Sequence, residues 1–416
     1  MSRPCLILIL LLLFVHANRI NGEEVLSEEE HKKICRTTLL DVDSNLWYTD
    51  MMTSRKPECK SSSSSTTDDI NDDKKLLIVS PHTNAFLIKV QKHSLDLFIN
   101  EPFEYIVYDD SIPYEHFTNW KTNGISNIIK HTTLDHGGTY KNVSESFHLD
   151  RRCLFPNTLE PFINNANTRC SDIYQYILRD KAIYCHNGIV LFLDADVILT
   201  KPFKPSIYMS SNSHHKSFHP DNDNKNSQVL TPNIISVPQI RKYIDINGNS
   251  GEISYMWTAL NIMNMPILRN NYGLYDMNWD CGQITSNYEN NIIFNNTLKL
   301  DSGGHTYDWL IKHKVNIEWY SIDDIYQLGD MDQSNEHSSP IWKWFSQEWQ
   351  NIYKKNSLYD LEFKSQLLGG LFLHLRNAGN WMSHGKRYKW IQPDQVHILM
   401  NLLNKRHEEF QSTNTS

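Results

Sequence analysis

The chain has 416 residues, of which 40% are hydrophobic and 11% aromatic, and its formal net charge at pH 7 is −8. This composition indicates a globular protein of one large domain or two ordinary ones, and it argues against a disordered chain. The charge is negative and the Lys and Arg residues are scattered, so a protein that binds nucleic acid through its phosphates is also disfavoured.

The first 22 residues are typical of a secretory signal peptide. Arg3 precedes an apolar run from Leu6 to Val15, which His16-Ala17 follows. The run is about half of the roughly 20 residues that a membrane-spanning helix needs. We therefore expect cleavage after Ala17 or Gly22 and no other membrane-spanning segment, with an uncleaved signal anchor as the alternative. The expected location is the lumen of the ER or Golgi, or the cell exterior.

Cysteines and glycosylation motifs are compatible with that compartment. Beyond Cys5 six cysteines remain, which allows up to three disulfides among 15 pairings. They are Cys35, Cys59, Cys153, Cys170, Cys185 and Cys281. No two of them have the CxxC spacing of a thiolate zinc site. Asn-X-Ser/Thr motifs begin at Asn142, Asn295 and Asn414.

Residues 23–73 are predicted to form an N-terminal extension that ends in a linker. Residues 23–60 are charged, with Cys35 and Cys59 as the expected anchors. The tract of Ser, Thr and Asp from Ser61 to Asp73 has almost nothing to bury. We expect the folded domain at residues 74–410, followed by a short tail at residues 411–416.

A strand–helix–strand unit opens the folded domain. Lys75–Ser80 and Phe103–Tyr108 are apolar runs of strand length, and the apolar residues of Thr83–Ile99 have helical spacing. Such a unit implies parallel strands joined by a right-handed crossover. Ligands of such sheets bind beyond the carboxyl ends of the strands, which makes Ser80 and Asp109 candidate ligand contacts. The alternative for Asp109 is a purely structural place at the start of a turn.

The strongest signal lies between Gly188 and Phe203. The apolar run Gly188–Leu193 predicts a strand buried on both faces, and Asp194 and Asp196 follow it with one alanine between them. In a strand, residues i and i+2 point to the same side, so both carboxylates are expected to face one spot. Two charges at the end of a buried strand are costly without a cation, and Mg²⁺ or Mn²⁺ prefers oxygen ligands. Two acids that merely face solvent in a turn are the alternative.

The segment FLDADVILTKPF resembles the DxD motif of glycosyltransferases with the GT-A fold. The resemblance implies an α/β protein whose Rossmann-like, mostly parallel central sheet is flanked by helices. It also implies that a metal at Asp194 and Asp196 grips the diphosphate of a nucleotide sugar, or that Asp194 contacts the ribose. The nucleoside is then expected at the first two strand ends, near Ser80 and Asp109. The implied cofactor is Mn²⁺ or Mg²⁺, the implied donor is UDP-linked, and the implied acceptor is a glycan, glycoprotein or glycolipid.

Two neighbouring segments carry weaker resemblances. Ser171–Leu178 predicts a helix with Ser171 as its N-cap, and it is similar to the helix before the DxD motif in the α1,4-glycosyltransferase-like family. This implies that Asp172 contacts the donor sugar, but Gln175 stands where that family usually has Arg. The alternative for Asp172 is a helix-start charge favoured by the helix dipole. The sequence LDSGGHT at Leu300–Thr306 resembles the DTGG-type segment of a group of DxD glycosyltransferase-like proteins, and its glycine turn is expected to present N–H groups to an anion or a sugar hydroxyl.

Later elements complete the predicted site. Tyr255–Met265 predicts a strand, with Trp257, Thr258 and Asn261 as its exposed positions. The resemblance to GT-A enzymes implies that this strand borders the donor and the acceptor. Leu368–Asn377 predicts one buried strand that carries His374. A lone His on an apolar strand is usually a core residue, but the resemblance to GT-A enzymes implies that His374 is a third metal ligand.

Other late segments predict an edge strand at Asn316–Tyr320, a helix at Pro393–Phe410, and an aromatic helical segment at 342–353 that packs in the core or stacks on a sugar.

The sequence as a whole therefore predicts a metal-dependent glycosyltransferase of the secretory pathway. If the enzyme inverts, a carboxylate must deprotonate the acceptor hydroxyl, and Asp301 and Asp280 are the candidates. A second hypothesis is a secreted, catalytically silent sugar-binding protein on the same scaffold. A metal-dependent phosphotransferase or nuclease is disfavoured because no P-loop or basic groove accompanies the acid pair.

Overall fold

The structure is a computed structural model. It describes residues 56–59, 76–83, 85–110, 125–143, 166–209, 231–279, 281–287, 292–324, 365–375, 382–383, 386–387 and 393–414. The predicted signal peptide, the linker at 61–73, the aromatic segment at 342–353, Cys35, Cys153 and Asp280 lie outside these residues. Among the helices that the structure describes, none combines the length and apolarity that a membrane crossing requires.

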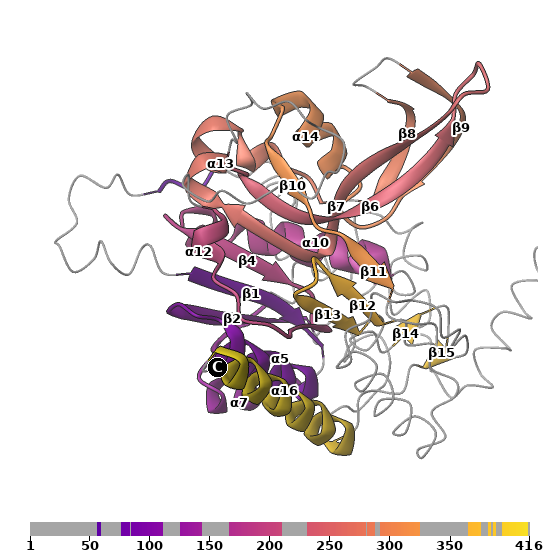
Figure 1. Cartoon of the computed structure of the whole chain (residues 1–416). Coiled ribbons are helices and arrows are strands. Elements are labelled where there is room, and N and C mark those ends of the chain that lie inside the picture. The colour runs from indigo at the N-terminus through magenta and orange to yellow at the C-terminus, as the bar shows by residue number, and fades with distance from the viewer. Residues whose placement is uncertain are drawn as a thin grey trace, which may run out of the picture.

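The centre of the molecule is a seven-stranded sheet with the order β10-β6-β7-β4-β1-β2-β3 (Figure 1). Strand β7 is antiparallel to its neighbours β4 and β6, and every other pair in the sheet is parallel. The strands are β1 (Leu76–His82), β2 (Phe103–Asp109), β3 (Thr139–Asn142), β4 (Ile189–Leu193), β6 (Ile234–Ile244), β7 (Ser250–Asn264) and β10 (Ile317–Trp319). The predicted α/β class with a mostly parallel sheet is confirmed, and β10 is an edge strand as expected.

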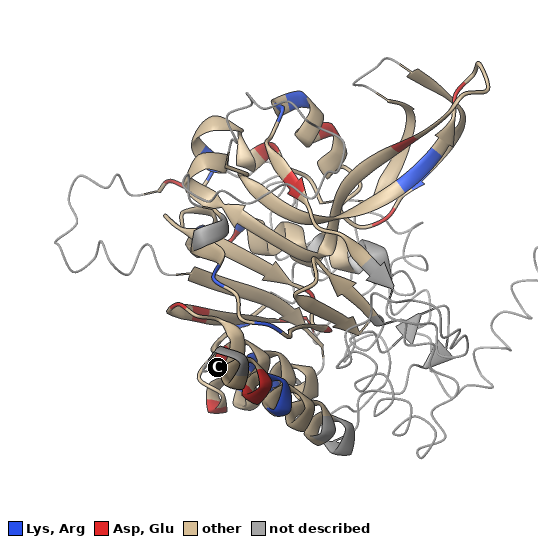
Figure 2. Cartoon of the chain, in the orientation of Figure 1, with Lys and Arg blue, Asp and Glu red and all other residues tan. Residues whose placement is uncertain are grey.

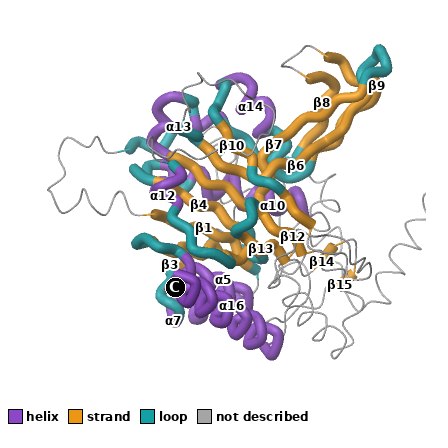
Figure 3. Tube along the Cα trace, in the orientation of Figure 1, coloured by secondary structure: helices purple, strands orange, loops and turns teal. Residues whose placement is uncertain are grey.

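Helices cover both faces of this sheet (Figures 1 and 3). One face carries α5 (Ala85–Phe98), α7 (Ile125–Asp135) and α16 (Pro393–Asn414), and the other carries α10 (Ala166–Arg179), α13 (Met265–Asn271) and α14 (Thr306–His313). Successive residues of a strand point to opposite faces. Accordingly, Leu191 and Leu193 of β4 join the core beneath α5 and α16, whereas Val190 and Phe192 join the core beneath α10. The strand is buried on both faces because both layers are helical.

Helix α10 differs from its prediction at the start. It begins at Ala166, five residues before Ser171, so Ser171 lies inside the helix and the predicted N-cap is wrong. Ala and Arg in the segment 166–170 are good helix formers, which extends the helix upstream of the predicted cap.

A second, four-stranded sheet has the order β11-β12-β13-β5 and is antiparallel throughout. Its strands are β5 (Val197–Leu199), β11 (Ile322–Asp324), β12 (Ser365–Leu368) and β13 (Phe372–Leu375). The single strand predicted for Leu368–Asn377 is therefore wrong. Gly369 and Gly370 have φ values of 56° and 67°, which turn the apolar run into a hairpin. Glycine alone adopts this left-handed backbone without a steric penalty.

Strands β6 and β7 extend beyond the central sheet and form a projecting arm with β8 (Gly282–Asn287) and β9 (Ile292–Leu300), at the upper right of Figure 1. Its small core contains Tyr255, Phe294 and Tyr307. Figure 2 shows acidic and basic residues interspersed over the described elements, without a continuous basic band on them.

The remaining described elements are short. They are α11 (Lys181–Tyr184), α12 (Pro205–Tyr208), the 3₁₀ helix η3 (Leu274–Asp276), β14 (Met382–Ser383) and β15 (Lys386–Arg387).

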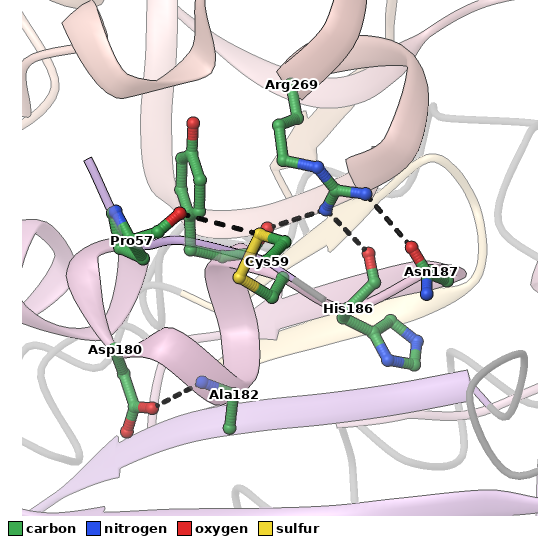
Figure 4. The surroundings of a disulfide bond; sticks show 9 residues. Pro57, Cys59, Asp180, Ala182, His186, Asn187 and Arg269 are labelled. Carbon is green, nitrogen blue, oxygen red and sulfur yellow. Dashed lines mark hydrogen bonds between the residues drawn. A yellow bond between two sulfur atoms is a disulfide. The ribbon is translucent and has the colours of Figure 1, made fainter. Parts of the chain in front are cut away.

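A disulfide joins Cys59 to Cys185 and ties the N-terminal extension to the end of α11 (Figure 4). The predicted role of Cys59 as an anchor is thereby confirmed. Arg269 of α13 bonds to the residues on both sides of Cys185. It donates hydrogen bonds to the carbonyl oxygens of Tyr184 (2.8 Å) and His186 (3.1 Å) and to Asn187 Oδ1 (3.0 Å). The disulfide therefore lies at the amino end of β4, opposite the end that carries the two acids.

Candidate functional site

The strand order places a topological switch point between β1 and β4. From β1 the sheet continues to β2 and β3 on one side, and from β4 it continues to β7 and β6 on the other. Open α/β sheets bind ligands in the crevice beyond the carboxyl ends of the strands at such a point. Because β1, β2 and β4 are parallel, Ser80, Asp109 and Asp194 lie at the same edge of the sheet, as predicted.

The DxD segment is a turn and not the end of a strand. Strand β4 stops at Leu193, and Asp194 to Asp196 connect it to β5 in the second sheet. The Val197 N–H donates to the Asp194 carbonyl oxygen at 3.1 Å, which closes the turn. The prediction that both acids project as strand residues i and i+2 is wrong, because the chain leaves the central sheet between them.

The two acids have different surroundings within this turn. Asp194 is half-buried, and its Oδ1 accepts a hydrogen bond from the Ala195 N–H at 2.8 Å. Asp196 is buried, with 4% of its surface exposed.

The second sheet brings His374 to Asp196. Strand β13 pairs with β5 so that His374 lies opposite Val197, and the Leu375 N–H donates to the Asp196 carbonyl oxygen at 2.8 Å. His374 Nε2 is 3.3 Å from Asp196 Oδ1. Residues almost 180 positions apart thus meet at the carboxyl edge of β4, as the resemblance implied.

The other ring nitrogen of His374 indicates what this contact requires. His374 Nδ1 is 3.2 Å from Gln366 Oε1, so the Nδ1–H is the donor in that pair. In a neutral imidazole, Nε2 then directs a lone pair at a carboxylate oxygen. The contact is favourable only with a proton on Nε2 or with a cation bound by both groups. Metal-ligating histidines have this arrangement, in which the second nitrogen donates to an oxygen of the protein.

The donor set fits a divalent ion in part. Neighbouring ligands of an octahedral ion with bonds of about 2.1 Å lie about 3 Å apart, close to the separation of His374 Nε2 and Asp196 Oδ1. Within the described part of the chain, no group of three or more His, Cys, Asp and Glu side chains converges on one point. Asp196 and His374 are therefore a pair, which Asp194 does not complete, and the remaining ligands would have to come from a bound molecule.

Helix α10 forms one wall of the site. Its Tyr174 is fully buried and donates to the Thr258 carbonyl oxygen at 2.5 Å. Burial, and next to it the negative charge of Asp194, raises the pKa of Tyr174 well above its ordinary value. Tyr174 therefore lies near the DxD turn. Asp172 precedes it by two residues in the same helix, but the side chain of Asp172 lies outside the described residues.

Strand β7 forms another wall. The Trp257 ring is 4.9 Å from the His374 ring and nearly perpendicular to it, and Trp257 is partly exposed as predicted. Thr258 and Asn261 are buried, so their predicted exposure is wrong. Asn261 accepts from Ser236 Oγ at 2.5 Å and donates to the Trp257 carbonyl oxygen at 2.7 Å, beside the register shift between β6 and β7.

Ser80 and Asp109 have partners inside the protein. Ser80 is buried, and its Oγ is 3.1 Å from His82 Nε2. Asp109 is also buried, and its Oδ2 accepts hydrogen bonds from Ser126 at 2.5 Å and Tyr140 at 2.8 Å. These contacts support the structural alternative for Asp109, and a nucleoside contact by either residue stays a prediction.

The arm carries Asp301. Arg241 forms an ion pair with the Asp301 carboxylate, and the Asp301 N–H donates to Tyr255 Oη at 3.0 Å. Leu260 of β7 pairs with Leu193 at the end of β4. Tyr255 lies five residues before Leu260 on β7, which is about 17 Å of strand. The role of Asp301 as a general base stays a prediction.

The glycine turn after Asp301 does not present its N–H groups to a ligand. The Gly303 N–H donates to the Trp279 carbonyl oxygen at 2.8 Å, and the Gly304 N–H donates to the Asp301 carbonyl oxygen at 2.9 Å. The Thr306 N–H likewise donates to the Gly303 carbonyl oxygen. The predicted anion-binding role is wrong for these N–H groups, because the Gly303 N–H docks the turn against the segment before β8 and the Gly304 and Thr306 N–H groups close the turn itself.

One polar residue near the DxD turn has no counterpart among the predicted site residues. Gln91 lies on the buried face of α5, at helical spacing from Leu87 and Leu95, and none of its surface is exposed. A polar side chain on an otherwise apolar helix face was the available signal, because buried polar groups need partners.

Neither a family model nor a curated protein matches the sequence. Solved structures are similar to it, and two of them are glycosyltransferases. The glycosyltransferase GlyE of Streptococcus pneumoniae TIGR4 is 12% identical over 82% of this chain and 64% of its own, with a TM-score of 0.26. The PaToxG glycosyltransferase is 13% identical over 60% of this chain and 70% of its own, with a TM-score of 0.25. The chain spans less than two thirds of the GlyE chain, and TM-scores this low carry no argument about its activity.

Proposed function

We propose that this chain is a metal-dependent glycosyltransferase with the GT-A fold, which moves a sugar from a nucleotide-diphosphate donor to an acceptor in the secretory pathway. The observation that carries the proposal is the meeting of Asp196 and His374 at the carboxyl end of β4, beside the switch point of the sheet. A buried carboxylate and an imidazole nitrogen that face each other need a positive charge between them, which a bound cation would supply.

Asp196 and His374 would hold Mn²⁺ or Mg²⁺ together with oxygens of the bound donor, and Asp194 would contact the ribose. When bound, the ion would offset the charge that develops on the leaving diphosphate. The protein residues supply position. Backbone pairing of β5 with β13 holds His374, and its Nδ1–H bond to Gln366 orients the ring. We assign the nucleoside of a UDP-linked donor to the ends of β1 and β2, near Ser80 and Asp109, and the donor sugar to Asp172.

The rest of the chemistry concerns the acceptor. Trp257 offers a partly exposed aromatic ring beside His374, which is suited to the apolar face of a sugar. An inverting reaction also needs a base for the acceptor hydroxyl, and Asp301 and Asp280 remain the candidates. The segments at 56–59 and 181–187 are joined by a disulfide, which is typical of an oxidising compartment such as the ER lumen.

Ligand-dependent melting tests the metal site. Wild-type protein is melted with UDP and UDP-sugars, each with and without Mn²⁺, beside Asp196→Asn. A bound ligand at 100 times its Kd stabilises a protein by about 2.7 kcal/mol. We expect a rise in Tm that needs both nucleotide and Mn²⁺ in the wild type and is lost in Asp196→Asn, which keeps the side-chain size and removes the charge.

The matched control is Asp96→Asn, which removes the same charge from the exposed side of α5, where Asp96 pairs with Lys92. It should respond like the wild type. If Asp196→Asn binds nucleotide with Mn²⁺ as the wild type does, the contact with His374 is a plain ion pair and the metal-site proposal is wrong.

A further inference from the structure

We propose that Gln91 is the positioning residue of the DxD turn, and that its amide group sets the backbone geometry on which metal and donor binding depend. The inference rests on the proposed function, because it assigns a role in that same site. Gln91 lies in α5, more than 100 residues before the turn, and it reaches the turn through backbone carbonyl oxygens.

The amide of Gln91 bonds to both ends of the turn. Its Nε2 donates to the Asp194 carbonyl oxygen at 2.8 Å and to the Val197 carbonyl oxygen at 2.7 Å. Asp194 and Val197 are also the residues that the turn's own closing bond joins. One side chain therefore fixes both sides of the segment that presents Asp194 and Asp196.

The orientation of this amide is determined by the other half of the group. The Tyr105 hydroxyl donates to Gln91 Oε1 at 2.7 Å, and His82 Nε2 lies 3.1 Å from the same oxygen. Both donor hydrogens of the amide and one lone pair of its oxygen are therefore used, and the second lone pair accepts from His82 when Nε2 carries the proton. A flipped amide would direct its oxygen at two carbonyl oxygens, so the assignment of nitrogen and oxygen follows from the contacts.

The same contacts link the two strands at the switch point. His82 Nε2 is 3.0 Å from the Tyr105 hydroxyl and 3.1 Å from Ser80 Oγ, and Ser80 and His82 are at the carboxyl end of β1. Through Gln91, this end of β1 is held against the turn that follows β4. Ser80 thus belongs to a buried polar network that sets the spacing of the crevice walls. Displacements of about 1 Å at such sites can lower rates about 100-fold.

A role in general stability is the competing explanation, and Ser94 provides the matched control. Ser94 is buried in the next turn of α5. Its Oγ donates to the Gln91 carbonyl oxygen at 2.7 Å and accepts from the Leu199 N–H at 3.2 Å. Ser94 therefore bonds to the same stretch of chain as Gln91, but at the far end of β5 and away from the acids.

The experiment compares Gln91→Glu with Ser94→Ala. Gln91→Glu keeps the shape of the side chain and replaces the donor nitrogen by an oxygen that faces two carbonyl oxygens. Three quantities are measured: Tm, hydrogen exchange of the amides of residues 195–199, and affinity for UDP with Mn²⁺. We expect both variants to lower the Tm. Gln91→Glu alone should speed exchange at Val197 and weaken UDP binding about tenfold or more, which is 1.4 kcal/mol or more.

Ser94→Ala should speed exchange at Leu199 and leave UDP affinity within about twofold of the wild type. Equal loss of affinity in the two variants at equal loss of Tm would reduce Gln91 to a structural role and overturn the proposal. So would a Gln91→Glu variant with the exchange and affinity of the wild type.

If Gln91→Glu does not fold, Tyr105→Phe replaces it in the experiment. This variant removes one hydrogen bond to Gln91 Oε1 and keeps both N–H donors of the Gln91 amide. It should speed exchange at Val197 and weaken UDP binding by less than tenfold, and wild-type values for both would overturn the proposal. A wild-type protein that shows no metal-dependent UDP binding would instead refute the proposed function. Exchange at Val197 in Gln91→Glu would then decide whether Gln91 holds the turn.

Discussion

Removal of the disulfide between Cys59 and Cys185 should lower stability without changing donor binding. The cross-link spans a sequence separation of 126 residues. In the chain-entropy model, a loop of this length destabilises the unfolded state by about 5 kcal/mol, and measured effects are typically about 2–4 kcal/mol. We therefore expect Cys59→Ser/Cys185→Ser to lose about 2–5 kcal/mol of unfolding free energy.

Urea unfolding followed by circular dichroism measures this loss, and UDP binding with Mn²⁺ is measured on the same samples under native conditions. The affinity should be unchanged, because Cys185 precedes the amino end of β4 and the DxD turn follows its carboxyl end. The serine variant isolates this disulfide, whereas a reducing agent acts on every cysteine. A variant as stable as the wild type would refute the reasoning, and so would a variant that unfolds normally but binds donor more weakly.

Three further predictions concern single side chains. Gly303→Ala should destabilise the fold more than Gly137→Ala in urea unfolding. Both glycines have positive φ, which costs about 1–2 kcal/mol for alanine, but a Cβ at Gly303 would lie 2.1 Å from the Met256 carbonyl oxygen and one at Gly137 would meet nothing within 4 Å; equal losses would contradict the close approach. Burial raises the pKa of Tyr255 from 10.0 to about 12, so its contribution to stability is complete below pH 10 and is lost as the pH rises to about 12. Tyr255→Phe should therefore reduce the loss of stability over that interval, and an unchanged pH profile would count against it. His374→Ala should weaken Mn²⁺-dependent UDP binding by less than Asp196→Asn does, because the charged Asp196 carboxylate and the diphosphate remain as ligands; calorimetry that ranks the two variants in the opposite order would contradict this.

Local patterns in the sequence are sufficient to predict three strands of the central sheet, but not β3, which lies in a stretch that has no clear periodicity. Strands β1, β2 and β4 are short apolar runs that end in polar residues, and α5 has helical spacing between Phe86 and Phe98. Their parallel arrangement follows from the strand–helix–strand order. The common edge of Ser80, Asp109 and Asp194 can thus be predicted without knowledge of any contact.

Contacts between distant segments cannot be predicted in this way. The turn at Asp194–Asp196 exists because β5 leaves the central sheet to pair with β13, a strand from the far end of the chain. The pair Gly369-Gly370 marks the turn between β12 and β13. The apolar residues on both sides of it also fit one continuous strand, so local pattern does not separate the hairpin from a single strand. Gln91 gives no local sign of its partners in the DxD turn, which lie more than 100 residues away. The position of His374 beside Asp196 is predicted only through the resemblance to GT-A enzymes.

The most direct test of the central claim is turnover. Purified wild-type protein and Asp196→Asn are incubated with a panel of UDP-sugars, with Mn²⁺ or with EDTA, and the released UDP is measured with and without glycan acceptors. The proposed function predicts that the wild type releases UDP from at least one donor only when Mn²⁺ is present, and that Asp196→Asn does not. A wild-type protein that binds a UDP-sugar with Mn²⁺ but neither hydrolyses nor transfers it would contradict the claim and identify a silent sugar-binding protein.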